Sequence, residues 1–226
     1  MRKAFMAAML VLAWPAYAAA APIVLTFEGV GNVADILGFY NGGTDSAGHS
    51  GPNVGVSFLT GALGLVDSDA GGTGGLSHEP SGQTALFFLD VATAIVTVRA
   101  GFDTGVAFFF SGNPGVGNGT VMVYDGINGR GTLLANAILN SSLTPQSGCG
   151  GGDPTGTYSC WAPVGIPFSG IARSIAFGGS ANFIAFDNVT FGSVTPSSPT
   201  VPEPGSALLL ITAAAGVAFR RRAWRA

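Results

Sequence analysis

Apolar and polar side chains alternate in several short stretches of the chain. In Thr120–Tyr124 two valines alternate with other side chains, and Ser174–Phe177 repeats the pattern with isoleucine and phenylalanine. A period of two places alternate side chains on one face of a strand, so these stretches predict half-buried strands of an antiparallel sheet. The predicted strands are Ile23–Glu28, Val54–Leu59, Ala62–Val66, Ala85–Leu89, Ala94–Arg99, Val106–Phe110, Thr120–Tyr124, Leu133–Leu139, Ser174–Phe177 and Asn182–Phe191.

Turn-forming pairs separate many of these strands, and no stretch between residues 22 and 195 has the pattern of an amphipathic helix of three turns. The chain holds 36 glycines and 16 phenylalanines among 226 residues. Many turns that join short apolar strands account for both excesses. The sequence therefore predicts an all-β fold, an antiparallel β-sandwich of jelly-roll type. The turn pairs are Asn118-Gly119, Asp125-Gly126, Asn128-Gly129 and Gly178-Gly179.

The N-terminus has the parts of a secretory signal peptide. Arg2 and Lys3 precede the apolar stretch Ala4–Trp14, and small residues follow it. This order is typical of a segment that signal peptidase removes. Cleavage after Ala18 fits the Ala-x-Ala pattern, and cleavage after Ala20 also fits. We therefore expect a signal helix within residues 1–20.

The C-terminus also has three parts. A linker rich in proline and serine occupies residues 195–200, and Val201-Pro202-Glu203-Pro204 follows it. An apolar run then ends in Arg220-Arg221-Arg222. As a helix, residues 205–219 span roughly 22 Å against a hydrocarbon core of ~30 Å, which predicts a short transmembrane helix. The three arginines are expected to act as a cytoplasmic stop.

The Val201-Pro202-Glu203-Pro204 segment, the short apolar helix and the terminal arginines together resemble the PEP-CTERM sorting domain, the substrate signal of exosortase. The resemblance covers about residues 199–226. It implies that exosortase cuts the tail near the Pro-Glu-Pro segment. The precursor would then lie transiently in the inner membrane, and the mature protein would reach the cell surface or the extracellular matrix. A plain C-terminal membrane anchor is the alternative.

Several stretches of the middle of the chain resemble a recurrent ectodomain of PEP-CTERM proteins, which implies a β-sandwich without an established activity. The predicted domain order is a signal peptide at 1–20, a sandwich at 21–194, a linker at 195–200 and a sorting tail at 201–226. The stretches that carry the resemblance are Thr26–Gly29, Phe39–Gly43, Gly51–Phe58, Val123–Gly126 and Phe186–Phe191.

Charge separates the ends of the chain from its middle. Six of the nine basic residues lie at the two ends, and all 12 acidic residues lie between Glu28 and Glu203. An acidic middle argues against nucleic acid as a partner, because phosphates require clustered lysine and arginine. It suits a soluble secreted domain.

The chain has two cysteines, Cys149 and Cys160, which flank a glycine-rich stretch in the exported segment. Exported proteins meet an oxidising environment, so we expect these two residues to form a disulfide. Closing so short a loop contributes ~3 kcal/mol in the chain-entropy model. Two free thiols are the alternative.

A structural calcium ion is a candidate cofactor. Glu28 and Asp187 lie at the two ends of the predicted sandwich, where the first and last strands are often neighbours. Jelly-roll carbohydrate modules of similar layout often hold calcium there with carboxylates and backbone carbonyls, and calcium takes six to eight oxygen ligands. The alternative is that Asp187 and Asn188 form only a turn or an edge contact. Asp67–Gly72 is a second acidic loop that lacks a full calcium-binding pattern.

Two apparent catalytic or cofactor motifs have simpler interpretations. Gly29–Ala34 fits the G-x-G-x-x-A pattern, but Gly38–Gly43 breaks the helix that a dinucleotide site needs. His49 and His78 lie in loops, and neither adjoins a G-x-S-x-G elbow. The sequence therefore predicts no enzyme. A glycoside hydrolase is the alternative, because its two catalytic carboxylates are paired in space and not by their spacing in the sequence.

The leading functional hypothesis is a non-catalytic surface or matrix protein. The alternative is a lectin-like module that binds the exopolysaccharide of the cell. Such a module needs stacking aromatic side chains beside polar groups on one exposed face. Tyr40, Tyr158 and Trp161 are the candidates.

Overall fold

The predicted strands form, and the chain between them is almost free of helix. The computed structural model describes residues 22–113, 118–141 and 158–197. Within these ranges the one complete helical element is the 3₁₀ turn Ser68–Ala70. The strands are β1 Ile23–Leu25, β2 Ala34–Asp35, β3 Val56–Phe58, β4 Leu63–Val66, β5 Thr84–Phe87, β6 Thr93–Phe102, β7 Gly105–Gly112, β8 Gly119–Tyr124, β9 Leu133–Leu139, β10 Ala162–Pro167, β11 Ala172–Gly178 and β12 Ile184–Phe191.

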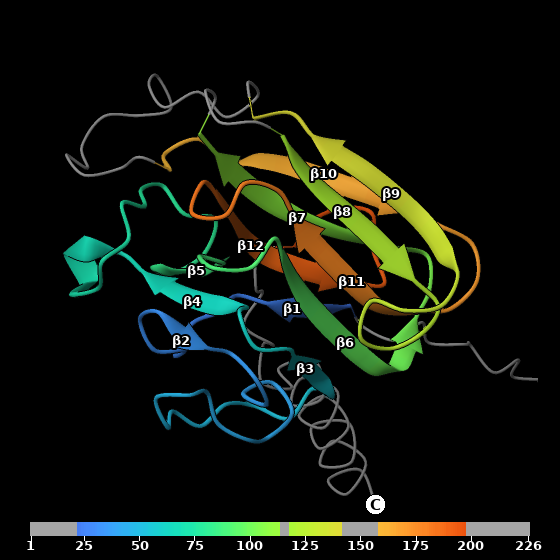
Figure 1. Ribbon diagram of the computed structural model, residues 1–226, viewed down its shortest axis with the longest axis horizontal. Coiled ribbons are helices and arrows are strands. Elements are labelled where there is room, and N and C mark those ends of the chain that lie inside the picture. The colour runs from blue at the N-terminus through green and yellow to red at the C-terminus, as the bar shows by residue number, and fades with distance from the viewer. Residues whose placement is uncertain (1–21, 114–117, 142–157, 198–226) are drawn as a thin grey trace, which may run out of the picture.

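The strands form two antiparallel sheets (Figure 1). One sheet has seven strands in the order β10-β7-β12-β5-β4-β2, with β1 also paired to β12. The other has five strands in the order β3-β6-β11-β8-β9. The prediction of an all-β antiparallel fold is therefore confirmed. The jelly-roll type of the sandwich stays a prediction.

Both sheets contribute to one aromatic core. Phe108 of β7 and Phe186 of β12 come from the seven-stranded sheet, and Phe177 of β11 comes from the five-stranded sheet. The Phe177 ring centroid lies 4.7 Å from that of Phe186 and 5.4 Å from that of Phe108. All three side chains are fully buried. These contacts hold the two sheets face to face.

The seven-stranded sheet is buried on its outer face as well. Leu76 and Tyr158 form an isolated bridge over it and pack with Phe87 of β5 and Ala185 of β12. Every residue of β12 is buried, without alternation. Two-sided burial explains why β12 begins with three apolar residues in a row, Ile184–Phe186, and does not alternate.

The central strand β12 changes neighbours part-way along its length. Phe186 pairs with Leu86 of β5, whereas Val189–Phe191 pairs with β1. The register against β7 shifts between Asp187 and Thr190, and Asn188 has a left-handed backbone with φ of 49°. The first and last strands are thus neighbours. Asp187 lies at the bulge where β5 gives way to β1.

Two strands were not predicted, the two-residue β2 and the longer β10. β10 contains Pro163 and Pro167, and a strand with two prolines resembles a loop in the sequence. In the structure β10 is an edge strand that pairs only with β7. Proline is tolerated at an edge because its missing N–H group can face away from the partner strand.

The two predicted flanking helices, at residues 1–20 and 205–219, lie outside the described residues. In the ranges that are described, no helix has the length and hydropathy of a membrane span.

Candidate functional site

The bulge of β12 gathers polar groups in the interior of the protein. Asp187, Asn188 and Thr190 are all fully buried. The Asp187 carboxylate accepts hydrogen bonds from the backbone N–H of Asn188 at 2.6 Å and from that of Ser81 at 3.0 Å. The Ser81 hydroxyl lies 3.1 Å from Asp187 Oδ2 and 2.5 Å from Asn188 Oδ1. Ser81 thus links the loop before β5 to both Asp187 and Asn188 of the bulge.

Glu28 binds the same loop from the other side. Its Oε1 atom accepts hydrogen bonds from the backbone N–H groups of Gln83 at 2.9 Å and Thr84 at 2.8 Å. Gly82, between Ser81 and Gln83, has φ of 51°, and a Cβ atom there would lie 2.1 Å from the Glu28 carboxyl carbon. A glycine is therefore needed at this position. The structure brings Glu28 and Asp187 to opposite ends of one short loop, 81–84.

Burial raises the pKa of Asp187 to about 8, although hydrogen bonds from Asn188 and Ser81 oppose this shift. The negative charge of Glu28 raises the pKa further. Burial also raises the pKa of Tyr40, and the charges of Asp187 and Glu28 add to that shift. Asp187, Glu28 and Tyr40 therefore influence one another's pKa, since the charge of one acts on the others.

One buried donor beside this cluster, Asn188 Nδ2, lacks a hydrogen-bond partner within the described part of the chain. An unpaired buried polar atom costs about 1–3 kcal/mol, so such atoms often mark a site with a missing partner. We name Glu28, Asp187, Asn188, Ser81 and Tyr40 the bulge cluster. Its two carboxylates and further side-chain oxygens suit a hard cation such as calcium. Among the described residues no three His, Cys, Asp or Glu side chains group around a common metal position, so backbone and amide oxygens would complete the ligand set.

The two histidines, His49 and His78, are not part of the bulge cluster. His49 Nδ1 lies 2.8 Å from Asp45 Oδ2, and the buried Asp45 carboxylate also accepts from the backbone N–H groups of Gly31, Ala47 and His49. Burial alone would raise the pKa of Asp45, but the hydrogen bonds from Gly31 and His49 hold it below its usual range. We call Asp45, with the three backbone N–H groups and the His49 ring that it binds, the Asp45 clamp. In the sequence, the Asp-x-x-x-His spacing of Asp45 and His49 is the one local feature that could have indicated it. His78 is exposed on a turn with φ of 56°.

Asp45→Ala is expected to lower the free energy of unfolding by about 2–3 kcal/mol, because it removes the acceptor of three backbone N–H groups. The folded-state pKa of Asp45 is depressed. Its contribution is therefore present above the ordinary pKa of about 4 and is lost as pH falls through the folded value. Urea denaturation at neutral and acidic pH measures the effect. Asp69→Ala, at an exposed carboxylate, is the matched control. Equal stability of the two variants at neutral pH would contradict the clamp.

The glycine motif does not open a helix. Residues 29–33 form turns, and β2 begins at Ala34. The chain there is held by Asp45, whose Oδ2 atom accepts from the Gly31 N–H at 2.8 Å. Without a helix N-terminus, this segment lacks the feature on which dinucleotide phosphates bind.

The proposed sugar-stacking aromatics do not share an exposed face. Tyr40 is 4% exposed and Tyr158 is 6% exposed. The Tyr158 hydroxyl donates to the Asn182 carbonyl at 2.6 Å, and Trp161 Nε1 donates to the Ser77 carbonyl at 3.0 Å. Tyr40 and Tyr158 are therefore core residues, and the sequence missed this because each lies in a loop-like stretch.

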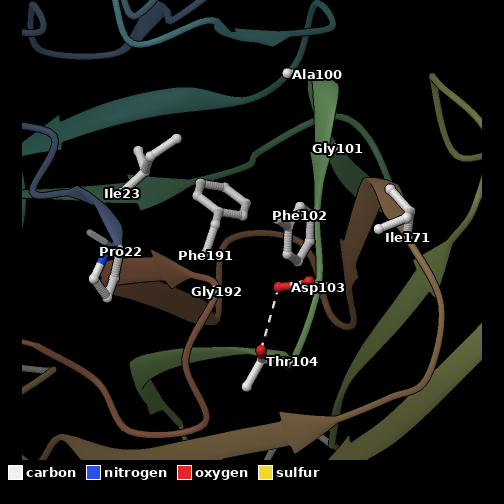
Figure 2. A pocket seen from close by; sticks show the side chains of 10 residues that line it. All are labelled: Pro22, Ile23, Ala100, Gly101, Phe102, Asp103, Thr104, Ile171, Phe191 and Gly192. Carbon is white, nitrogen blue, oxygen red and sulfur yellow. Dashed lines mark hydrogen bonds between the residues drawn. The ribbon is translucent and has the colours of Figure 1, made fainter. Parts of the chain in front are cut away.

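A recess of about 490 Å³ lies at one end of the two sheets (Figure 2). Phe102, Phe191 and Ile171 form apolar parts of its lining, and the Asp103 carboxylate projects beside them. Thr104 Oγ1 donates to Asp103 Oδ1 at 3.2 Å. Apolar walls with a few polar groups are typical of small-molecule sites.

One of the two cysteines of the predicted disulfide, Cys160, lies within the described residues. Cys160 is 3% exposed and is not a free thiol. Cys149 lies outside the described residues, so the pairing stays a prediction. Ala18, Val201-Pro202-Glu203-Pro204 and Arg220-Arg221-Arg222 also lie outside them.

The C-terminal tail matches a known sorting motif. The PEP-CTERM protein-sorting motif matches residues 200–222. This chain carries a PEP-CTERM motif. The match contains the Val201-Pro202-Glu203-Pro204 segment, the apolar run and the three arginines in the predicted order. PEP-CTERM motifs are C-terminal sorting signals of exported proteins and are generally associated with processing by exosortase.

Comparisons of the whole chain give distant likenesses. No curated protein matches it. Among solved structures, the K2 cleaved adhesin domain of Lys-gingipain (Kgp) has a TM-score of 0.48 and 13% identity, over 77% of this chain and 99% of that one. A glycoside hydrolase family 43 arabinoxylan arabinofuranohydrolase from Bacillus subtilis has a TM-score of 0.35 and 13% identity, over 66% of this chain and 31% of that one. The chain thus spans about a third of the hydrolase. The PEP-CTERM motif, rather than these likenesses, carries the functional argument.

Proposed function

We propose that this chain is a non-catalytic protein of the cell surface or extracellular matrix, sorted and processed through its tail. The PEP-CTERM motif at residues 200–222 carries the proposal. In this scheme signal peptidase removes residues 1–20, Arg220-Arg221-Arg222 keep the chain end cytoplasmic, and exosortase cuts near Val201-Pro202-Glu203-Pro204.

Changes in the tail test the sorting function. Glu203→Ala and deletion of Arg220–Arg222 are each expected to leave most of the protein as uncleaved precursor in the inner membrane. Fractionation of the producing cells, with mass spectrometry of the intact protein, measures the fraction that keeps its tail. Asp69→Ala removes an exposed carboxylate far along the chain from the tail and should be processed normally. Normal delivery of both tail variants to the surface would show the sorting proposal to be wrong.

We also propose that the bulge cluster holds a structural calcium ion. The observation that supports it is the meeting of Glu28 and Asp187 on loop 81–84, beside the side-chain oxygens of Ser81 and Asn188. Glu28, Asp187 and the Asn188 side-chain oxygen would supply ligands. The ion would neutralise two carboxylates that otherwise repel each other, which would stabilise the join between β1, β5 and β12.

A lectin-like function is the second candidate, now supported by the recess at Asp103 rather than by Tyr40 and Tyr158. A sugar ring can place its apolar face on the exposed Ile171 and donate a hydroxyl hydrogen bond to the Asp103 carboxylate. Screening the protein and its Asp103→Ala variant on a glycan array tests this. Binding that the variant loses supports the lectin. An absence of binding to any glycan argues for the purely structural role.

A further inference from the structure

The edge strands of the two sheets differ in how well they are protected from pairing with a further strand. In the described chain the sheet edges are β2, β10, β3 and β9, and the three-residue β1 also has one unpaired side. β2 has two residues and β3 has three. β10 carries two prolines, and its Gly165 packs so closely on the Val194 carbonyl that a Cβ there would clash with it. Short strands, prolines and covering loops are the usual protections of an edge.

In the described part of the chain β9 is neither short nor proline-bearing and has no ladder on its outer side, although β10 of the other sheet approaches part of it. It extends over seven residues, from Leu133 to Leu139, with no proline and no charged side chain. It pairs with β8 along one side only. Leu133 is 48% exposed and Ile138 is 70% exposed. Seven residues span ~23 Å at 3.3 Å per residue, which is long for an open edge. In Figure 1, β9 forms the outer rim of its sheet.

The surface beside this edge is uncharged, unlike the rest of the protein. Neither β8 nor β9 contains a charged residue, and Met122 and Tyr124 of β8 are partly exposed beside Asn136 and Leu133 of β9. Elsewhere the described residues carry ten carboxylates and three arginines. Two copies of so acidic a chain repel each other over most of their surfaces. The face of β8 and β9 is where they can approach without that repulsion.

We propose that β9 is a self-association edge at which a second copy of this chain adds its own β9, antiparallel, across a two-fold axis. Pairing over the full strand places Leu133 opposite the partner's Leu139 and Asn136 opposite the partner's Asn136. The backbone groups on the open side of β9 then form hydrogen bonds, and the five-stranded sheet becomes a ten-stranded sheet across two chains. Assembly stops at two copies, because the other edges are short or proline-bearing and a two-fold interface is closed.

This inference is independent of the sorting function and of the calcium ion. It predicts how copies associate once they are concentrated at a surface or in a matrix. One strand pair with its flanking side chains is a small interface, so we expect a weak dimer with dissociation in the micromolar range.

Sedimentation analysis of the full-length protein in detergent micelles tests the inference. Across the micromolar range the wild type should shift from monomer to dimer. Ile138→Lys should stay monomeric, because each dimer would place two lysines beside the new strand pair. Leu59→Lys is the matched control: Leu59 is 41% exposed but lies between β3 and β4, and this variant should dimerise as the wild type does. The inference is overturned by a monomeric wild type, by a dimeric Ile138→Lys variant, or by equal loss of dimer in both variants.

A single cysteine tests the geometry without adding charge. Asn136→Cys should form an intermolecular disulfide under mild oxidation, because residue 136 faces its own copy across the two-fold axis. Asn53→Cys, at another exposed asparagine, should not. Non-reducing electrophoresis reads out both variants. Equal cross-linking of the two, or none at residue 136 in a sample that sediments as a dimer, would exclude the β9 pairing even if Ile138→Lys had misfolded.

Discussion

Asp187→Asn is expected to make the calcium-free protein more stable than the wild type at pH 8. Burial raises the pKa of Asp187 to about 8 in the folded state, whereas the unfolded chain has an ordinary aspartate pKa of about 4. At pH 8 the wild type must therefore either keep a buried charge or bind a proton on folding. Asparagine has nearly the same shape and is neutral. Like the protonated carboxyl group, it has one acceptor oxygen, so either the Ser81 N–H on Oδ2 or the Asn188 N–H on Oδ1 loses its acceptor. We expect this loss to cost less than the buried charge.

The pH dependence has a definite sign. Because the folded pKa of Asp187 is raised, its contribution to stability is fully present below the unfolded pKa and is lost as pH rises through the folded pKa. Between about pH 4 and 8 the folded state binds one proton more than the unfolded state, which corresponds to a slope of ~1.4 kcal/mol per pH unit. Urea denaturation of the wild type in a chelator should show stability that falls over this window. Asp187→Asn should remove most of the slope.

Calcium should reverse the order of the two proteins. A cation at the bulge cluster favours the ionised carboxylate, so calcium should raise the melting temperature of the wild type at pH 8 and leave Asp187→Asn unchanged. Glu28→Gln should weaken the response to calcium. It should also shift the pH window downwards in the chelator, because the Glu28 charge contributes to the raised pKa of Asp187. Asp69→Asn, at an exposed carboxylate, should behave as the wild type does. An identical response to calcium in Asp187→Asn and the wild type would remove Asp187 from the proposed ligand set.

Phe186→Ala is expected to lower the free energy of unfolding by about 3–5 kcal/mol, which is a large part of the stability of a typical domain. The Phe186 side chain is fully buried at the centre of β12 and contacts Phe177 across the sheets and Phe108 beside it. Truncation leaves a cavity where these three rings meet. The adjacent Asp187 should also lose its fixed position, so the calcium response should weaken together with stability.

Two substitutions separate cavity formation from other effects. Phe186→Leu keeps most of the apolar volume and should cost clearly less than alanine. Leu133→Ala truncates a side chain that is 48% exposed and should change stability by under about 1 kcal/mol. Chemical denaturation at one pH measures all three variants. A cost for Phe186→Ala no larger than that for Leu133→Ala would show that the aromatic contacts do not hold the sheets together.

The local pattern of the sequence was sufficient for most strands. Strands such as β8 and β11 expose one face, so their alternation is visible in the sequence. β10 was missed because proline is read as a strand breaker, and its edge position is a property of the sheet rather than of the strand. The burial of Tyr40 and Tyr158 was missed for a similar reason, since neighbouring segments from elsewhere in the chain cover them.

The candidate site was predictable only in part. The sequence offered Glu28 and Asp187 as carboxylates at the ends of the sandwich. It gave no signal for Ser81, which lies more than a hundred residues from Asp187 and binds it through a backbone N–H at 3.0 Å. It also gave no signal for the raised pKa of Asp187, because burial depends on every strand packed around the bulge.

The sequence by itself determined the sorting tail and the all-β class, because a sorting signal is read as a linear segment and strand patterning is local. The match to the PEP-CTERM motif at residues 200–222 and the two antiparallel sheets confirm these two predictions. Only the tertiary structure decided which carboxylate is buried, which aromatics are core residues and which edge is open. Each of these depends on contacts between residues far apart in the chain, such as Ser81 with Asp187 and β1 with β12.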